Sequence, residues 1–144
     1  MMGWPALTDS AAAQRVFARL KDETPRAYAL VLRQTGELVG LLTVCAPSER
    51  LCARRELAGL NGCELSFGVF ADYRREGFAY EAVCHVIERL FLIEGRDYVS
   101  CASFGCDRPA LALQKKLGFM RMLSERVELN GKPVDRIESV LSRT

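Results

Sequence analysis

The chain has 144 residues, of which 49% are hydrophobic and 26% are charged. This length is enough for one domain that buries its own apolar core. The net charge of +2 is too small for a typical nucleic-acid-binding protein, which carries a strong basic stripe. No run of about 18 apolar residues occurs, so the sequence predicts no membrane span.

The sequence contains six cysteines, and none of them are spaced Cys-x-x-Cys. Without that spacing the pattern does not predict a zinc site, and we expect no metal. The N-terminus also lacks the charged and apolar regions of a secretory signal. We therefore expect a cytoplasmic protein whose thiols stay reduced.

The first half of the chain predicts one helix followed by three strands. Apolar residues recur at helical spacing over residues 8–20. Two β-rich runs, residues 27–33 and 38–44, flank a glycine turn and are expected to form a hairpin. Residues 45–61 are polar and are expected to form a loop with room for a short helix. A third strand is expected over residues 63–70.

The second half predicts a helix, a strand, a second helix and a final hairpin. The strongest element is the helix over residues 79–93, whose apolar side chains share one face and which Gly95 can end. Asn130 and Gly131 are a strong hairpin-turn signal. The remaining strand, helix and two hairpin strands are expected at residues 98–104, 109–117, 119–128 and 134–141.

This order of elements predicts an α/β (α+β) fold, in which one sheet carries helices on its faces. Strand 63–70, helix 79–93 and strand 98–104 are expected to form a parallel crossover. No linker-like segment divides the chain, so residues 1–144 are expected to form a single domain.

The turn before the long helix is a candidate phosphate site. Helix N-termini present unpaired N–H groups and a partial positive charge. Gly77 lets the backbone approach a ligand, Ala79 keeps a neighbouring position small, and Arg74 and Arg75 add positive charge. The glycine patterns of Rossmann folds and P-loops are absent from this turn. A plain strand-to-helix turn with surface arginines is the alternative.

Several stretches resemble motifs of the GNAT superfamily of acyltransferases. Arg74, Gly77 and Ala79 match its motif A, Arg/Gln-x-x-Gly-x-Gly/Ala. Residues 107–119 are similar to its Asn-x-x-Ser…Lys-Leu-Gly-Phe segment. Residues 64–69 resemble the Glu-Leu-Gly-Tyr-Trp-Ile strand of the ribosomal-protein N-acetyltransferase (Rim-type) branch. The motifs follow one another in the family's order and spacing.

The resemblance implies a mixed, mostly antiparallel central sheet with helices on both faces and a parallel, splayed strand pair at the cofactor site. It also implies acetyl-CoA as cosubstrate, with the pyrophosphate on the backbone of motif A and the pantetheine arm along the preceding strand. Strand ends with free backbone groups suit such an amide-rich ligand. The cofactor-binding residues carried over are Val69, Phe70, Arg74, Arg75, Glu76, Gly77, Phe78 and Ala79.

The implied reaction is N-acetylation, by direct attack of a neutral amine on the acetyl thioester. The acceptor would be a peptide or protein N-terminus or a small-molecule amine. Such a reaction needs a base, oxyanion stabilisation and an acid for the leaving thiolate. Glu128 resembles the base of the ribosomal branch, and Glu64 at the start of the splayed strand is the second candidate. A solvated surface glutamate is the alternative for each.

The sequence departs from the family at the acid that protonates the thiolate. Ala110 stands where a serine is expected, and Gln114 stands where other branches have a tyrosine. Ser103, Cys106, Tyr73 and water stay open as the acid.

Two other functions also stay open. One is a catalytically impaired CoA-binding regulatory module, and the other is an interaction domain without CoA that pairs through an edge strand. The second follows from Trp4-Pro5, which matches a point after the family's first strand and helix, so that strand 27–33 would be an unpaired edge. The sequence does not identify the acceptor. It does not fix the oligomeric state either, and a homodimer is one of the alternatives.

Overall fold

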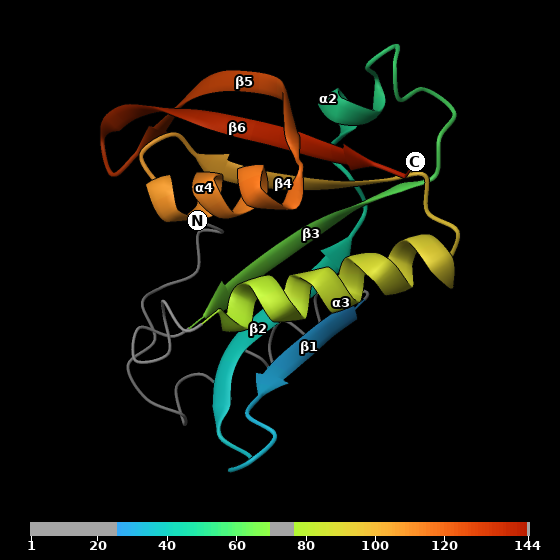
Figure 1. Cartoon of the computed structure of the whole chain (residues 1–144). Helices are drawn as coiled ribbons and strands as arrows, with labels where there is room; N and C mark the ends of the chain where they lie inside the picture. The colour runs from blue at the N-terminus through green and yellow to red at the C-terminus, as the bar shows by residue number, and fades with distance from the viewer. Residues whose placement is uncertain (1–25, 70–76, 144) are drawn as a thin grey trace.

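The computed structural model describes residues 26–69 and 77–143 (Figure 1). The helix predicted over residues 8–20 lies outside these ranges. The strands are β1 (Arg26–Val31), β2 (Leu38–Cys45), β3 (Gly62–Val69), β4 (Tyr98–Phe104), β5 (Met120–Leu129) and β6 (Lys132–Ser142). The helices are α2 (Glu49–Cys52), α3 (Phe78–Leu92) and α4 (Arg108–Leu117).

The described strands form one six-stranded sheet in the order β1-β2-β3-β4-β6-β5. Every neighbouring pair is antiparallel except β3 and β4, which are parallel. The mixed, mostly antiparallel sheet that we predicted is therefore confirmed. The last two strands form the predicted hairpin, since Asn130 has φ 52° and Gly131 has φ 77°, as a tight primed turn requires.

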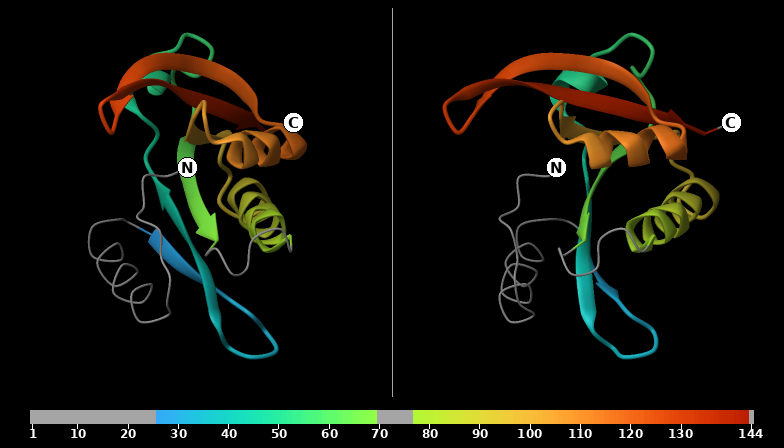
Figure 2. Two further views of the ribbon diagram at one scale, coloured as in Figure 1. Left: turned by 90° about the vertical axis from the view of Figure 1, so that its left-hand side faces the viewer. Right: turned by 60° about the vertical axis from the view of Figure 1, so that its left-hand side comes forward.

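Helices cover both faces of the sheet (Figures 1 and 2). Side chains alternate between the two faces along a strand. Val99 of β4 belongs to an apolar core that includes Val83 and Leu90 of α3. Its neighbour Tyr98 belongs to a second core, with Leu51 of α2. The sheet thus separates two cores, with α3 on one face and α2 on the other.

The parallel pair β3–β4 is short and opens into a V. Only three residue pairs join the strands, at Gly62, Cys63 and Glu64 of β3. Beyond them β3 stays paired with β2 as far as Val69, and β4 stays paired with β6 as far as Phe104. The strands meet at one end and diverge toward the other (Figure 1). The predicted splay is confirmed, and it leaves the facing edges of the two strands unpaired with each other.

Glycine and proline chemistry defines the helix ends near the V. Gly77 precedes α3 with φ 81°, a left-handed conformation that glycine adopts at little cost. At the start of α4, the Asp107 side chain accepts a hydrogen bond from the Ala110 N–H, and Pro109 occupies the first turn. Gly118 ends that helix with φ 97°. Within the described ranges, no helix combines the length and apolarity that crossing a membrane requires.

Candidate active site

The first turn of α3 lies beside the carboxyl end of β3, at the open end of the V (Figure 1). Phe78 and Ala79 form this first turn, directly after Gly77. A Cβ built on Gly77 would meet no atom of the described residues within 4 Å, so these residues leave space beside the backbone there. Such a helix start can receive a phosphate group. Of the residues predicted to bind the cofactor, Phe70, Arg74, Arg75 and Glu76 lie outside the described ranges.

Val69 is the last residue of β3 and pairs with Gly40 of β2. Because β3 and β4 have already separated at this point, the opposite edge of Val69 faces the V. The structure therefore brings Val69, Gly77, Phe78 and Ala79 to the same end of the V. Their role in binding a cofactor stays a prediction.

Glu64 lies at the vertex of the V, as the last residue of β3 that pairs with β4. Its neighbours Cys63 and Leu65 face the core under α3, so the Glu64 carboxylate points to the opposite face. The Cys45 thiol donates a hydrogen bond to Oε2 of Glu64 at 3.5 Å. The other oxygen, Oε1, is buried and has no hydrogen-bond partner among the described residues.

The electrostatic surroundings of Glu64 raise the pKa of its carboxyl above the usual value. Burial raises the pKa of Glu64 most, and the nearby Glu138 carboxylate raises it further. The hydrogen bond from Cys45 and the charge of Arg136 act against this rise. Burial and the adjacent Glu64 also raise the pKa of the Cys45 thiol to about 11, so Cys45 stays a neutral donor at physiological pH.

Glu138 of β6 is a buried carboxylate on the same face as Glu64, and sequence reasoning missed it. It pairs with Ala102 of β4 and is only 3% exposed. Arg136 Nη1 lies 3.2 Å from its Oε2, while its Oε1 is buried and finds no hydrogen-bond partner in the described part of the chain. The strand carries four charged residues, Lys132, Asp135, Arg136 and Glu138, so nothing in the sequence distinguishes Glu138 from the others.

Glu128, the other predicted base, lies elsewhere in the sheet. It is exposed on the edge strand β5 and pairs with Pro133, close to the hairpin turn. When the pairing is followed across the sheet from Glu64 through β4 and β6, the residue of β5 at the same level is Met120. Glu128 is roughly 25 Å farther along that strand. The structure therefore does not bring the two predicted bases together.

On the α4 side of the V, Gln114 contacts Ser103. Gln114 is the one buried residue of α4, and its Nε2 donates a hydrogen bond to the Ser103 hydroxyl. Ser103 lies on β4 beyond the vertex of the V. Side chains alternate along β4, so the Ser103 side chain is on the face of the sheet opposite to that of Glu64. Of the other predicted acids, Cys106 is exposed and Tyr73 lies outside the described ranges. Sequence reasoning named Ser103 but did not foresee its contact with Gln114.

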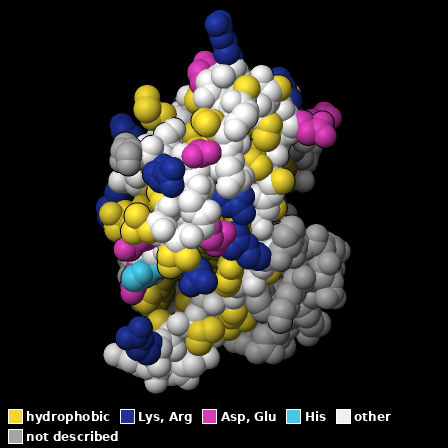
Figure 3. Space-filling view, turned by 90° about the vertical axis from the view of Figure 1, so that its right-hand side faces the viewer, with side chains coloured by type: hydrophobic (Ala, Val, Ile, Leu, Met, Phe, Trp, Pro, Cys, Tyr) yellow, Lys and Arg dark blue, Asp and Glu magenta, His cyan; other side chains and the backbone are white. Residues whose placement is uncertain are grey.

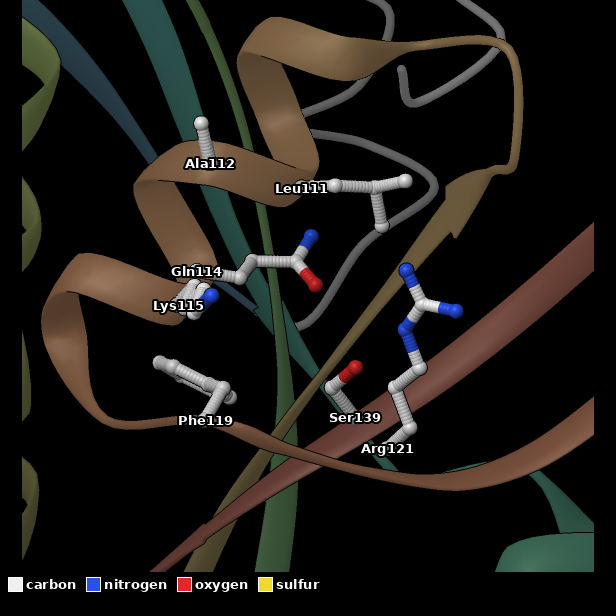
Figure 4. A pocket seen from close by; sticks show the side chains of 7 residues that line it. All are labelled: Leu111, Ala112, Gln114, Lys115, Phe119, Arg121 and Ser139. Atoms are coloured by element: carbon white, nitrogen blue, oxygen red, sulfur yellow. The ribbon is translucent and has the colours of Figure 1, made fainter.

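A cavity of about 440 Å³ lies beside α4, on the side of the β5–β6 hairpin (Figure 4). Its lining consists of Leu111, Ala112, Gln114, Lys115, Phe119, Arg121 and Ser139. The Gln114 amide extends toward Arg121 and Ser139 (Figure 4), and its Oε1 is buried without a partner among the described residues. The predicted cofactor-binding residues that the structure describes, Val69, Gly77, Phe78 and Ala79, do not line this cavity.

The single histidine of the sequence, His85, is exposed on α3. It lies on a face where basic, acidic and apolar side chains are interspersed (Figure 3). It is in the middle of the helix, away from the V. Among the described residues, no three His, Cys, Asp or Glu side chains gather in a way that could hold a metal ion.

A mixed sheet that splays at its parallel strand pair, beside the N-terminus of a helix, defines the acyltransferase fold expected from the sequence motifs. Residues 1–120 match the family model described as an acetyltransferase (GNAT) domain. The chain belongs to this family, whose members use acetyl-CoA as cosubstrate.

Solved structures with the same fold support this assignment. A ribosomal-protein-S5-alanine acetyltransferase from Vibrio fischeri has a TM-score of 0.70 at 14% identity, covering 98% of this chain and 79% of that one. A spermidine N-acetyltransferase chimera from Vibrio cholerae has a TM-score of 0.69 at 14% identity, covering 92% and 75%. A GNAT-family acetyltransferase from Bacillus anthracis has a TM-score of 0.67 at 14% identity, covering 81% of this chain.

The chain spans 65% of the length of the Bacillus anthracis protein. No curated protein sequence matches the chain significantly. At these identities the likeness concerns the fold, and the acceptor has to be argued from the site itself.

Proposed function

We propose that this chain is an N-acetyltransferase that transfers the acetyl group of acetyl-CoA to a primary amine, either a peptide N-terminus or a small molecule. The observation that carries the proposal is the V between β3 and β4, with the half-buried carboxylate of Glu64 at its vertex. We also propose that the protein acts in the cytoplasm, because all six cysteines are unpaired and that compartment keeps thiols reduced.

The residues present fit acetyl-CoA. Gly77 has a positive φ and no described residue crowds its Cα, so the start of α3 can approach a pyrophosphate closely. The edge of β3 near Val69 is turned toward the V and suits the amides of a pantetheine arm. Phe78 and Ala79 contribute first-turn backbone groups. The other residues that the motif assigns to the site, Phe70, Arg74, Arg75 and Glu76, lie outside the described residues.

In the reaction, the amine nitrogen bonds to the acetyl carbonyl carbon and the bond from that carbon to sulfur breaks. One proton leaves the nitrogen and one proton reaches the departing sulfur, giving an amide and a free thiol. Glu64 is the proposed base, since burial raises its affinity for a proton and its Oε1 accepts no hydrogen bond from the described residues. The Cys45 thiol holds the other oxygen and thereby orients the carboxylate.

The Ser103 hydroxyl is the proposed source of the proton for the thiolate. It lies on the opposite side of the V from Glu64, so the base and the acid would act on the two sides of one thioester. The amide of Gln114 fixes this hydroxyl by its hydrogen bond. Gln114 therefore positions the acid at the place where other branches of the family supply a tyrosine.

The first test is calorimetric titration with acetyl-CoA, followed by a thiol-release assay with several amines. The amines are spermidine and a tripeptide with a free N-terminal alanine. They are chosen because two structurally similar proteins are named as a spermidine acetyltransferase and as a ribosomal-protein-S5-alanine acetyltransferase. We expect acetyl-CoA to bind and at least one amine to release thiol. Absence of acetyl-CoA binding would reject the proposal, and binding without release would indicate a regulatory module.

The second test compares Glu64→Gln with Glu128→Gln, which makes the same change at the other predicted base. We expect Glu64→Gln to lower kcat by about 10²- to 10⁴-fold, as loss of a general base does. Its affinity for acetyl-CoA should stay the same in the calorimeter. If only Glu128→Gln lowers kcat, Glu128 and not Glu64 is the base.

A further inference from the structure

The cavity beside α4 lies on a different side of that helix from α3. Lys116 of α4 lies over the ring of Tyr80 of α3, 4.3 Å from the ring centroid, so this side of α4 faces α3. The next residue toward the start of the helix, Lys115, lines the cavity on the side of the β5–β6 hairpin (Figure 4). The cavity volume of about 440 Å³ falls within the range of small-molecule pockets, roughly 300–1,000 Å³.

A bulge in β5 turns Arg121 toward this cavity. Leu123 pairs with Glu138 of β6. Arg121 pairs with the next residue of β6, Ser139, which leaves Met122 as the extra residue of the bulge. Met122 and Leu123 both pack against the core on the α2 side of the sheet. Arg121 therefore lies on the other face, where it lines the cavity together with Ser139 (Figure 4).

The charges at the cavity are all positive. Lys115 and Arg121 are exposed, and neither makes an ion pair with a described residue. No acidic side chain is among the described residues that line the cavity. Two unpaired cations on either side of one cavity favour a ligand with a negative charge.

The other lining residues are mainly apolar. Leu111, Ala112 and Phe119 supply hydrocarbon surface, and the Ser139 hydroxyl lies beside Arg121 (Figure 4). An arginine binds a carboxylate through two parallel hydrogen bonds. Apolar walls favour a ligand whose remaining surface is hydrocarbon. The lining therefore fits a carboxylate on a small apolar body.

We propose that this cavity binds a small apolar carboxylate and that the bound ligand inhibits acetyl transfer through Gln114. The Gln114 amide extends from the cavity wall toward Arg121, and its Oε1 has no described partner (Figure 4). A carboxylate held by Arg121 repels this oxygen and attracts the amide N–H groups, so it favours the amide turned by about 180°. In that orientation Oε1 accepts a hydrogen bond from the Ser103 hydroxyl, whose proton is then withheld from the thiolate. The inhibition rests on the proposed function, whereas the binding does not.

The binding test compares 3-phenylpropionate with 3-phenylpropionamide, which has nearly the same shape and no charge. Their dissociation constants are measured by calorimetry on the full chain at pH 7, where the carboxylate is ionised. We expect the carboxylate to bind at least about tenfold more tightly than the amide, as one charge-assisted contact provides. Its affinity should stay the same in the presence of saturating acetyl-CoA.

Two variants remove the charges of the cavity one at a time. Arg121→Gln should abolish most of the preference for the carboxylate, and Lys115→Gln should reduce it. Both positions are exposed, so the fold should tolerate these changes. The matched control is Arg126→Gln, also on β5. Arg126 contacts Asp135 at 3.0 Å and does not line the cavity, so this variant should keep the wild-type preference.

The thiol-release assay tests the inhibition. Saturating 3-phenylpropionate should lower kcat by about tenfold or more, because the reaction loses its general acid. The KM for acetyl-CoA should not change, and 3-phenylpropionamide should have no effect.

The site is overturned if neither molecule binds, if both bind equally, or if the carboxylate competes with acetyl-CoA. A wild-type preference in both Arg121→Gln and Lys115→Gln would also overturn it. Binding of the carboxylate without any effect on kcat would overturn inhibition through Gln114. If no amine releases thiol, the proposed function and the inhibition both fail, and the calorimetric comparison decides the site by itself.

Discussion

At the scale of single residues, Glu64 combines partial burial with an oxygen that has no hydrogen-bond partner among the described residues, and the burial affects how it titrates. Burial raises its pKa above the usual value for glutamate, near 4.3. Because a base must be ionised to accept a proton, kcat/KM should rise with pH around that raised pKa. The pH–rate profile of the wild-type protein should show this acidic limb. Glu128→Gln should retain the limb, and its persistence in Glu64→Gln would contradict the assignment.

The same pKa shift predicts a dependence of stability on pH. Between the ordinary pKa of glutamate and its higher value in the fold, the native state binds more protons than the unfolded state. The free energy of unfolding contributed by Glu64 therefore falls as pH rises through this window. Glu64→Gln should weaken that fall, so the variant gains stability relative to wild type at pH 7 but not at pH 4. Urea unfolding at both pH values measures this, and equal differences at the two values would be inconsistent with it.

Gly77 allows the effects of backbone strain and of phosphate binding to be separated. Gly77 and Gly95 both have positive φ, 81° and 67°, and a Cβ on either would meet no atom of the described part of the chain within 4 Å. Gly77→Glu and Gly95→Glu should each lose about 1–2 kcal/mol of stability, because the left-handed conformation disfavours side chains. Only Gly77→Glu should weaken acetyl-CoA binding, by about tenfold or more, since its carboxylate repels phosphate. Equal affinities in calorimetry would place the cofactor elsewhere.

At the scale of elements, the contact of β3 with β4 depends on a glycine. Gly62 pairs with Tyr98, and a Cβ on Gly62 would lie 2.1 Å from the Tyr98 ring. Tyr98 is 1% exposed and has no room to move aside. Gly62→Ala should therefore cost about 1–3 kcal/mol, as overpacking of a core does.

Thermal unfolding tests this prediction, with Gly105→Ala as the control. The nearest atom to a Cβ on Gly105 lies at 3.4 Å, an ordinary contact distance. Gly105→Ala should melt close to the wild-type temperature. A Gly62→Ala variant that is as stable as this control would show that the β3–β4 contact adapts to a side chain.

Local signals explain why the described elements were largely predictable. The strand expected over residues 98–104 is β4 without change, and the helix expected over residues 79–93 is α3 shifted by one residue. Hydrophobic periodicity sets the interiors of these elements, and glycine or proline sets their ends. For the segment that contains the short helix α2, the sequence predicted a loop with room for a short helix, because a helix of a single turn shows almost no periodic pattern.

At the scale of the whole molecule, the site was only partly predictable. Glu64 and Gly77 stand inside local motifs, so the sequence alone could single them out. Glu138 has no such motif, and its relation to Glu64 depends on the strand order β3-β4-β6 and on the register of both pairs. The contact of Gln114 with Ser103 likewise depends on how α4 packs against β4. Tertiary pairing of distant segments supplies information that spacing along the chain does not contain.

The V also divides the sheet into two three-stranded halves, β1-β2-β3 and β4-β6-β5, that share only three residue pairs. A molecule bound across the V would add backbone hydrogen bonds to both halves and link them mechanically. Hydrogen exchange followed by mass spectrometry should then slow on addition of acetyl-CoA at residues 65–69 and 101–104, while β1 keeps its rate. Uniform slowing, or none, would mean that the two halves are already held together by other contacts.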